Sequence, residues 1–192
     1  MNKIISKEEF LRNWKFFVNE MKRGKIFIYP TDTIYGLGCN ALKIKSIIKI
    51  RRIKGRETKP FSVIVPNKKW INQNCYLDKK AKIYIKKLPG KYTFILRIKN
   101  KKAISKEVNK GLNSLGIRIP NNWFAKIVSK TKIPFLTTSV NISGKPHIIK
   151  LDEIDNEIKK EVDYIIDGGL LKNKPSTIIN FIDKKEVITK RN

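Results

Sequence analysis

Apolar positions near the start of the chain recur at helical intervals. Ser6 and Glu9 have the spacing of a capping box, and Gly24 can close the helix, so the pattern predicts a helix over residues 7–23. The next residues, 25–29, form a short apolar run that is typical of a strand. The chain is therefore expected to begin with a helix that leads directly into a strand.

A polar segment follows this strand. Residues 29–41 read Tyr-Pro-Thr-Asp-Thr-Ile-Tyr-Gly-Leu-Gly-Cys-Asn-Ala and contain hydroxyls, a carboxylate and two glycines. Ligands of open α/β sheets collect at the carboxyl ends of strands. We therefore interpret residues 29–41 as a binding loop and not as a core segment.

In the rest of the chain, segments with apolar residues at helical spacing alternate with short apolar runs that are typical of strands. Helical spacing predicts helices over 44–53, 78–87, 122–130 and 152–161. Short apolar runs predict strands over 61–65, 93–98, 116–119, 135–138, 164–166, 177–182 and 186–189. The order mixes β-α-β units with a β-rich C-terminal part. We therefore expect an α/β fold with one twisted mixed sheet flanked by helices.

Size and composition set limits on the class of protein. The chain has 192 residues, of which 41% are apolar, and this is enough for one substantial core. No stretch is long and apolar enough to cross a bilayer, and the N-terminus lacks the apolar core of a secretion signal. We expect a single domain over residues 1–192, a cytoplasmic location and no membrane contact.

The strong basic charge allows two interpretations. A formal net charge of +27 would attract any polyanion, including nucleotides and RNA. Lys greatly outnumbers Arg, however, and Ile and Asn are abundant, which is the composition that codon drift in an AT-rich genome produces. The lysines are spread along the whole chain, which argues against a disordered basic arm. The charge alone does not decide between function and drift.

Several kinds of site are disfavoured by what the sequence lacks. Cys39 and Cys75 stand far apart without a Cys-x-x-Cys pair, so we predict free thiols and not a zinc site. His147 is the only histidine, and no Gly-x-Ser-x-Gly elbow accompanies it, which argues against a Ser-His-Asp hydrolase. Residues 36–41 fit a loose Gly-x-Gly-x-x-Ala pattern, but polar residues separate them from the strand, and the Walker pattern is absent. A bound nucleotide would need another kind of site.

Lys54 and Arg56 form a candidate anion site. Gly55 between them and Pro60 beyond them favour an extended segment, in which residues two apart face the same ligand. Two fixed cations suit a polyphosphate, the Arg as a fork and the Lys as a point charge. The alternative is a solvated basic turn in a Lys-rich protein.

A second polar pair follows the predicted strand at 135–138. Ser139 and Asn141 have the spacing that keeps both side chains on one side of an extended chain, and two strand ends that carry such loops imply a shared site. The alternative is that these hydroxyls cap the next helix. Asp32 could equally be a turn or cap residue, and Arg118, a lone arginine in a predicted strand, could form a structural ion pair.

Taken in order, these segments resemble the YrdC-domain family over nearly the whole chain. The resemblance rests on the Tyr-Pro-Thr-Asp-Thr loop, Lys-Gly-Arg, Lys59-Pro60, Pro-Gly-x-x-Thr, Gly-Ile-Arg-Ile-Pro, Ser-x-Asn and Pro-Ser-Thr. Because the sequence stops at Asn192, it is similar to the short, single-domain bacterial threonylcarbamoyl-AMP synthases. It departs from them at Asn121-Asn122-Trp123, where many relatives have a His-Pro element.

The resemblance implies a nucleotidyltransferase that condenses L-threonine, bicarbonate and ATP into L-threonylcarbamoyladenylate and pyrophosphate for tRNA modification. It implies that threonine and ATP share one large, basic, concave cavity, that Mg²⁺ enters with ATP, and that a separate threonylcarbamoyl-transferase complex uses the product. Direct contact with tRNA is left open. The alternatives are a non-catalytic RNA-binding module and a relative that acts on another carbamoyl adenylate.

The resemblance also implies roles for particular residues of this chain, with no dedicated metal ligands. The catalytic set is Lys54, Arg56, Ser139 and Asn141. The threonine-binding set is Thr33, Arg97, Thr137 and Ser176. The ATP-binding set is Arg56, Lys59, Thr93, Ser139, His147 and Arg191.

Overall fold

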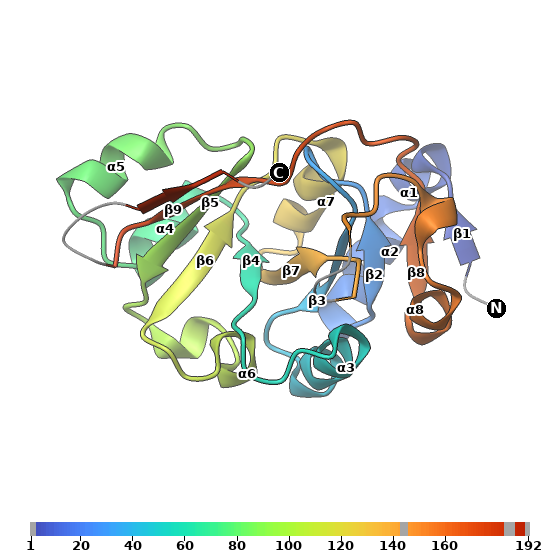
Figure 1. Cartoon of the computed structure of the whole chain (residues 1–192), viewed down its shortest axis with the longest axis horizontal. Coiled ribbons are helices and arrows are strands. Elements are labelled where there is room, and N and C mark those ends of the chain that lie inside the picture. Colours follow the sequence, from blue (N-terminus) through green and yellow to red (C-terminus); the bar gives the residue numbers. More distant parts are fainter. Residues whose placement is uncertain (1–2, 143–145, 183–186, 191–192) are drawn as a thin grey trace.

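The computed structural model describes residues 3–142, 146–182 and 187–190, and these residues form a single mixed sheet with helices on both of its faces (Figure 1). The strands are β1 (Lys3–Ile5), β2 (Phe27–Tyr29), β3 (Gly36–Asn40), β4 (Ser62–Ile64), β5 (Tyr92–Arg97), β6 (Ser114–Arg118), β7 (Phe135–Ser139), β8 (Tyr164–Ile166), β9 (Thr177–Asn180) and β10 (Val187–Thr189). Their spatial order is β1-β8-β2-β3-β7-β4-β6-β5-β9-β10. The predicted α/β class with one mixed sheet is confirmed.

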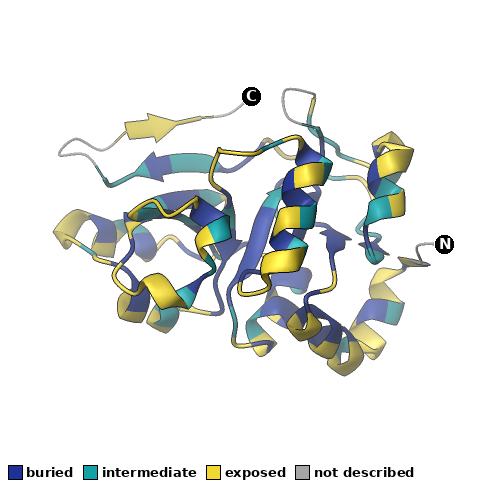
Figure 2. Cartoon of the chain, turned by 90° about the horizontal axis from the view of Figure 1, so that it is seen from below, coloured by how far each residue is buried: buried dark blue, intermediate teal, exposed yellow. Residues whose placement is uncertain are grey.

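The helices are α1 (Lys7–Arg12), α2 (Trp14–Arg23), α3 (Ile44–Lys54), α4 (Lys68–Asn74), α5 (Lys79–Ile85), α6 (Lys106–Asn109), α7 (Trp123–Lys130) and α8 (Asn156–Glu161). Two 3₁₀ turns, Lys101–Ala103 and Leu151–Glu153, precede α6 and α8. The helices present buried sides to the sheet and exposed sides outward (Figure 2).

Two hydrophobic clusters lie on the two faces of the sheet. Successive strand residues point to opposite faces, so Phe27 and Tyr29 of β2 pack with α1, α2 and α7, whereas Ile28 packs with α3 and β3 on the other side. The first cluster is rich in aromatic rings, with the Tyr29 and Phe124 ring centroids 4.3 Å apart. Because β2 is buried on both faces, its end is held rigidly in place.

The predicted helix over 7–23 is correct in extent but wrong in continuity. Ser6 accepts a hydrogen bond from the Glu9 backbone N–H at 3.1 Å, as the capping box predicts, and Gly24 closes α2 with a left-handed φ of 94°. Asn13 leaves the helical conformation and separates α1 from α2. Phe10 of α1 then stacks on Phe17 of α2 with ring centroids 4.8 Å apart, so the two pieces pack against each other.

The predicted binding loop over 29–41 is wrong for its second half. Residues 36–40 form β3, a fully buried strand between β2 and β7. A Cβ atom on Gly38 would overlap the carbonyl oxygen of Leu136 on the neighbouring strand, so the glycine permits close strand approach. Only the segment before Gly36 remains a loop. The dinucleotide interpretation of these glycines is therefore excluded.

Three short elements, β1, α4 and α6, were not predicted from the sequence. Two of them carry visible start signals, because Asn67 caps α4 and Ser105 caps α6. The helix predicted over 152–161 starts later, at Asn156, after a 3₁₀ turn. The other predicted elements lie within a few residues of those observed, and Glu186 of the last predicted strand lies outside the described residues.

Candidate active site

A polar cavity of about 160 Å³ opens where the loop before β3 meets β4, β5, β6 and β7. Most of its lining residues carry hydroxyls: Thr31, Thr33, Tyr35, Ser62, Thr93, Thr137, Thr138, Ser139 and Ser176. Two guanidinium groups, those of Arg56 and Arg118, also line it, and no carboxylate does among the described residues. Such a lining suits a small anionic or zwitterionic ligand.

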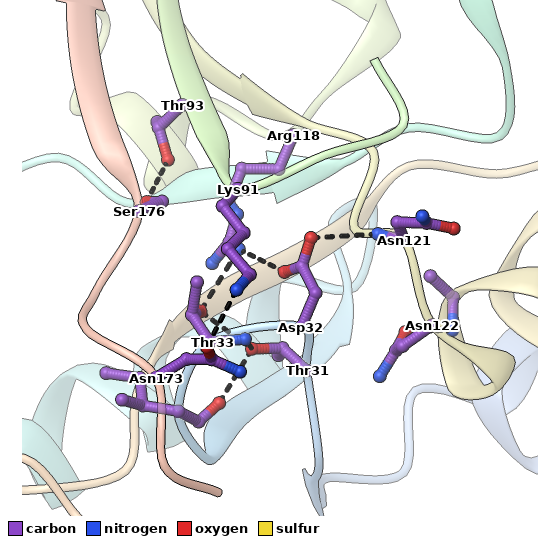
Figure 3. A network of polar contacts seen from close by, with 12 residues as sticks. Thr31, Asp32, Thr33, Lys91, Thr93, Arg118, Asn121, Asn122, Asn173 and Ser176 are labelled. Carbon is purple, nitrogen blue, oxygen red and sulfur yellow. Dashed lines mark hydrogen bonds and ion pairs between the residues drawn. The ribbon is translucent and has the colours of Figure 1, made fainter. Parts of the chain in front are cut away.

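The loop after β2 forms one wall by bonding to itself. The Thr31 hydroxyl donates to the Ile34 carbonyl oxygen at 2.7 Å and accepts the Thr33 backbone N–H at 3.0 Å. The two threonine hydroxyl oxygens lie 2.9 Å apart. These bonds fix the fully buried Thr33 hydroxyl at the cavity, as Figure 3 shows.

Arg118 lies at the buried end of the cavity. One of its terminal nitrogens donates to Asp32 at 2.9 Å and to the Thr33 hydroxyl at 3.3 Å (Figure 3). Its Nε is buried and has no hydrogen-bond partner among the described residues. Burial lowers the pKa of Arg118, and Asp32 opposes that shift. Arg118 therefore remains a cation at the wall of the cavity.

Asp32 and Asn122 link the site loop to the start of α7. Asp32 is a buried ion-pair partner, and its second oxygen accepts the Asn121 backbone N–H at 2.9 Å. The Asn122 side chain donates to the Pro30 carbonyl oxygen at 2.7 Å and accepts the N–H of Ala125 as the cap of α7. This asparagine pair therefore ties the first turn of α7 to the site loop.

The opposite walls come from β7 and β5. Tyr29 donates to the Thr137 hydroxyl oxygen at 2.6 Å, and burial raises the pKa of this tyrosine. The Thr93 and Ser176 hydroxyls lie 2.7 Å apart, and both residues are buried (Figure 3). Four of the predicted substrate residues, Thr33, Thr93, Thr137 and Ser176, therefore line one cavity.

The conformation predicted for the Lys54–Arg56 segment is wrong, although the two cations do converge. Lys54 is the last residue of α3, and Gly55 ends the helix with a left-handed φ of 55°. The Lys54 ammonium then donates to the Ser139 carbonyl oxygen at 2.7 Å, while Arg56 and Ser139 both line the cavity. The reversal at Gly55 therefore brings both cations to the end of β7.

The environment of Lys54 has a consequence for stability. The residue is 2% exposed, and burial, together with the nearby Arg56, lowers its pKa to about 8 from 10.5. Between these pH values the folded state binds fewer protons than the unfolded state, so the free energy of unfolding should rise with pH. The expected rise is about 3 kcal/mol over this window.

Urea unfolding measured from pH 7 to pH 10.5 tests this prediction. The Lys54→Met variant should lack the rise, because its side chain does not titrate. Lys45→Met is the matched control, since Lys45 is an exposed lysine of the same helix and should leave the pH profile of the unmodified protein unchanged. Parallel profiles for the unmodified protein and Lys54→Met would contradict the assignment.

Ser139 and Asn141 do not face the same space. β7 ends at Ser139, so strand alternation stops there, and Asn141 instead lines a second, more apolar depression of about 440 Å³. Ile142, His147 and Ile158 line the same depression. Asn141 and His147 thus line the same depression, and neither of them lines the polar cavity.

Two other predicted residues, Arg97 and Lys59, do not line the cavity. Arg97 is exposed near the end of β5, opposite Ser114, and is four residues from Thr93, a distance of about 13 Å along a strand. Lys59 is exposed, and its carbonyl oxygen accepts a hydrogen bond from Arg51. Arg191 lies outside the described residues. Arg118, by contrast, was predicted only as a possible ion-pair residue, and its carboxylate partner is adjacent to Thr33 in sequence.

Other chemistry is limited in the described part of the chain. Cys39 and Cys75 are free and buried, as predicted. Among the described residues, no three His, Cys, Asp or Glu side chains are grouped so that they could hold a metal ion. None of the described helices has the length and apolar character needed to span a bilayer.

Comparisons with known proteins agree with this geometry. A family model described as "Telomere recombination", that of the Sua5, YciO and YrdC proteins, matches residues 19–191. A Methanocaldococcus jannaschii protein, provisionally named threonylcarbamoyl-AMP synthase, is 44% identical over 96% of this chain and 90% of its own length.

Two solved structures are also similar. The YciO protein of Escherichia coli matches with a TM-score of 0.86 and 26% identity, over 100% of this chain and 96% of that one. Pyrococcus abyssi Sua5 matches with a TM-score of 0.87 and 26% identity over 98% of this chain, which corresponds to 56% of the longer Sua5 chain. Fold and family model agree, and the chain belongs to the Sua5–YciO–YrdC family.

Proposed function

We propose that this protein is a threonylcarbamoyl-AMP synthase, which condenses L-threonine, bicarbonate and ATP into L-threonylcarbamoyladenylate and pyrophosphate. The observation that carries the proposal is one small cavity with a buried cation at one end and a second cation beside the end of β7. Relatives named as threonylcarbamoyl-AMP synthases support it, as does a structure of P. abyssi Sua5 complexed with L-threonine.

The buried end of the cavity suits the amino acid. Arg118 supplies a buried cation for a carboxylate, and Thr33 and Thr137 contribute hydroxyls to the same lining. The Thr93–Ser176 pair adds two hydroxyls that can bond a small polar side chain. A zwitterion with a hydroxyl, such as threonine, satisfies these groups, whereas an apolar amino acid would leave buried polar atoms without partners.

We propose that the nucleotide binds toward the end of β7. Arg56 and Ser139 line the cavity there, and Lys54 lies immediately behind Ser139. The second depression has mostly apolar walls, with Asn141, His147, Glu153 and Asp155 as its polar residues, and it offers space for a base. ATP would lie with its phosphates near Lys54 and Arg56.

The reaction needs charge stabilisation more than acid–base groups. Threonine and bicarbonate give a carbamate and water; a carbamate oxygen attacks the α-phosphorus, and the bond to the β-phosphate oxygen breaks to release pyrophosphate. Negative charge grows on the departing pyrophosphate, and the fixed guanidinium of Arg56 would stabilise it, with Lys54 contributing while protonated. Arg118 and the threonine hydroxyls hold the other reactant in position.

Magnesium does not fit as a resident ion of this site. The cavity lining contains no carboxylate among the described residues, and Asp32 is engaged by Arg118 and Asn121. We therefore propose that Mg²⁺ enters bound to the phosphates of ATP, and we assign no metal ligand in this chain.

A pyrophosphate-release assay tests the proposal. The expected result is release that requires ATP, bicarbonate and L-threonine together, with L-threonylcarbamoyladenylate detected by mass spectrometry. Release that persists without threonine would contradict the synthase assignment. Preference for a different amino acid would indicate a relative acting on another carbamoyl adenylate, which the similarity to YciO makes worth testing. Binding of RNA without any turnover would favour an RNA-binding module.

A further inference from the structure

Arg51 is a buried arginine of α3 that lies one turn before Lys54. The residue is 6% exposed, and its guanidinium nitrogens lie within hydrogen-bond distance of backbone carbonyl oxygens in six contacts. Because the group has five N–H donors, at least one of them is shared between two acceptors. Burial lowers the pKa of this arginine, so the protein bears a cost to place it there. The role of Arg51 is therefore to be sought in the backbone segments that its guanidinium binds.

One terminal nitrogen of Arg51 gathers the loop that follows α3. It donates to the carbonyl oxygens of Arg56 at 2.9 Å, Glu57 at 3.1 Å and Lys59 at 3.1 Å. Nε and the other terminal nitrogen bind the carbonyl oxygens of Glu107 and Val108, at the far side of the loop. The 56–60 loop therefore curves around a single guanidinium group.

Only an arginine can make this arrangement. The guanidinium is planar and rigid and carries five N–H donors that point outward in fixed directions. A lysine at the same position would keep the charge and most of the stem, but it has three donors and no fork. The geometry of the loop therefore depends on the shape of the Arg51 group as well as on its charge.

The loop that Arg51 binds contains Arg56, which lines the cavity. The Arg56 backbone N–H donates to the Arg51 carbonyl oxygen at 3.0 Å, and both guanidinium groups lie over the Phe61 ring, at 4.6 Å and 5.0 Å from its centroid. A terminal nitrogen of Arg56 donates to the Pro60 carbonyl oxygen at 2.6 Å. Its Nε is buried without a partner among the described residues, and the residue lines the cavity.

We propose that Arg51 is a positioning residue that holds Arg56 in place for the phosphates of ATP. The proposal rests on the proposed function, because that function gives Arg56 its ligand. Arg51 itself does not line the cavity, so it acts through the backbone of the 56–60 loop. Its role differs from that of the adjacent Arg52, which is exposed and lies 3.6 Å from Glu161.

Equilibrium titration with ATP tests this proposal without requiring turnover. Arg51→Lys and Arg51→Gln should each weaken ATP binding about tenfold, because Arg56 loses its fixed orientation. Binding of L-threonine should change little. Arg52→Lys is the matched control and should bind ATP like the unmodified protein. In an Arg56→Ala background, Arg51→Lys should weaken ATP binding no further, since the residue through which it acts is gone.

Amide hydrogen exchange gives an independent readout. Arg51→Lys should speed exchange at Arg56 and Phe61, whose N–H groups bond to the Arg51 and Val108 carbonyl oxygens, while β4 and the first turns of α3 keep their protection. Equal loss of ATP binding with and without Arg56, or failure of both variants to fold, would make Arg51 a general stability residue and overturn the proposal.

The outcomes separate this inference from the proposed function. If the unmodified protein binds ATP but releases no threonine-dependent pyrophosphate, the proposed function fails while the coupling between Arg51 and Arg56 can still be measured. If the protein turns over but the two positions act independently, only this inference fails. Absence of ATP binding by the unmodified protein would overturn both.

Discussion

The Arg118→Met variant is expected to lose threonine-dependent pyrophosphate release by at least about a hundredfold. Methionine keeps much of the apolar stem, but it removes the buried cation that is available to a carboxylate. It also leaves Asp32, whose side chain is 5% exposed, without its partner. Breaking a buried ion pair by removing one side costs about 3 kcal/mol or more, so the free energy of unfolding should fall as well. Steady-state kinetics and urea unfolding measure the two effects.

A double variant separates binding from stability. Asp32→Asn combined with Arg118→Met removes the orphaned charge while an amide oxygen can still accept the Asn121 N–H. Stability should largely return, and threonine-dependent turnover should not. Recovery of turnover in the double variant would mean that Arg118 matters only as the counter-ion of Asp32. The proposed carboxylate site would then have to lie elsewhere.

The Gly38→Ala variant should be the most destabilising single methyl addition in the sheet. The new Cβ would meet the Leu136 carbonyl oxygen, and the Phe135 ring and the Tyr29 hydroxyl are also within about 3 Å. Backbone must move, and because β3 and β7 carry the site, both stability and turnover should fall. The expected loss is about 3 kcal/mol or more in the free energy of unfolding, measured with urea.

Gly111→Ala is the matched control for this methyl group. Gly111 has a positive φ of 76°, and a Cβ there would meet nothing within 4 Å. The substitution should therefore cost only about 1 kcal/mol of backbone strain and leave turnover unchanged. If Gly38→Ala were no more destabilising than Gly111→Ala, β3 and β7 would not approach as closely as the structure indicates.

Local signals in the sequence predicted much of the fold. The capping box at Ser6, the left-handed stop at Gly24 and the apolar runs of the strands all depend on neighbours within one turn or one strand. Local signals do not predict the structure of a segment whose conformation depends on contacts with residues far away in the sequence. Residues 36–40 look like a glycine-rich loop, yet they form a central strand because the facing strand leaves no room for larger side chains.

In the candidate site, too, local motifs predicted some of the residues, and distant contacts decided the place of others. The hydroxyls of Thr33, Thr93, Thr137 and Ser176 were predicted from motifs, and the structure brings them to one cavity. Arg97, predicted to bind threonine, lies at the exposed end of β5 and does not line the cavity, because motif order does not measure the distance along a strand. The role of Arg118 was left open because a lone arginine in a strand has the same local pattern whether it binds a ligand or an aspartate.

By itself, the sequence determined the α/β class, the caps and stops of the main helices, and the family, since these follow from short-range spacing and from motifs in a preserved order. Only the tertiary structure decided which polar residues share a cavity, how the reversal at Gly55 joins Lys54 to Ser139, and which carbonyl oxygens Arg51 gathers. The physical reason is that these contacts join segments far apart in the sequence, such as Lys54 and Ser139, which are 85 residues apart. Their geometry depends on strand order and close packing, which no local pattern specifies.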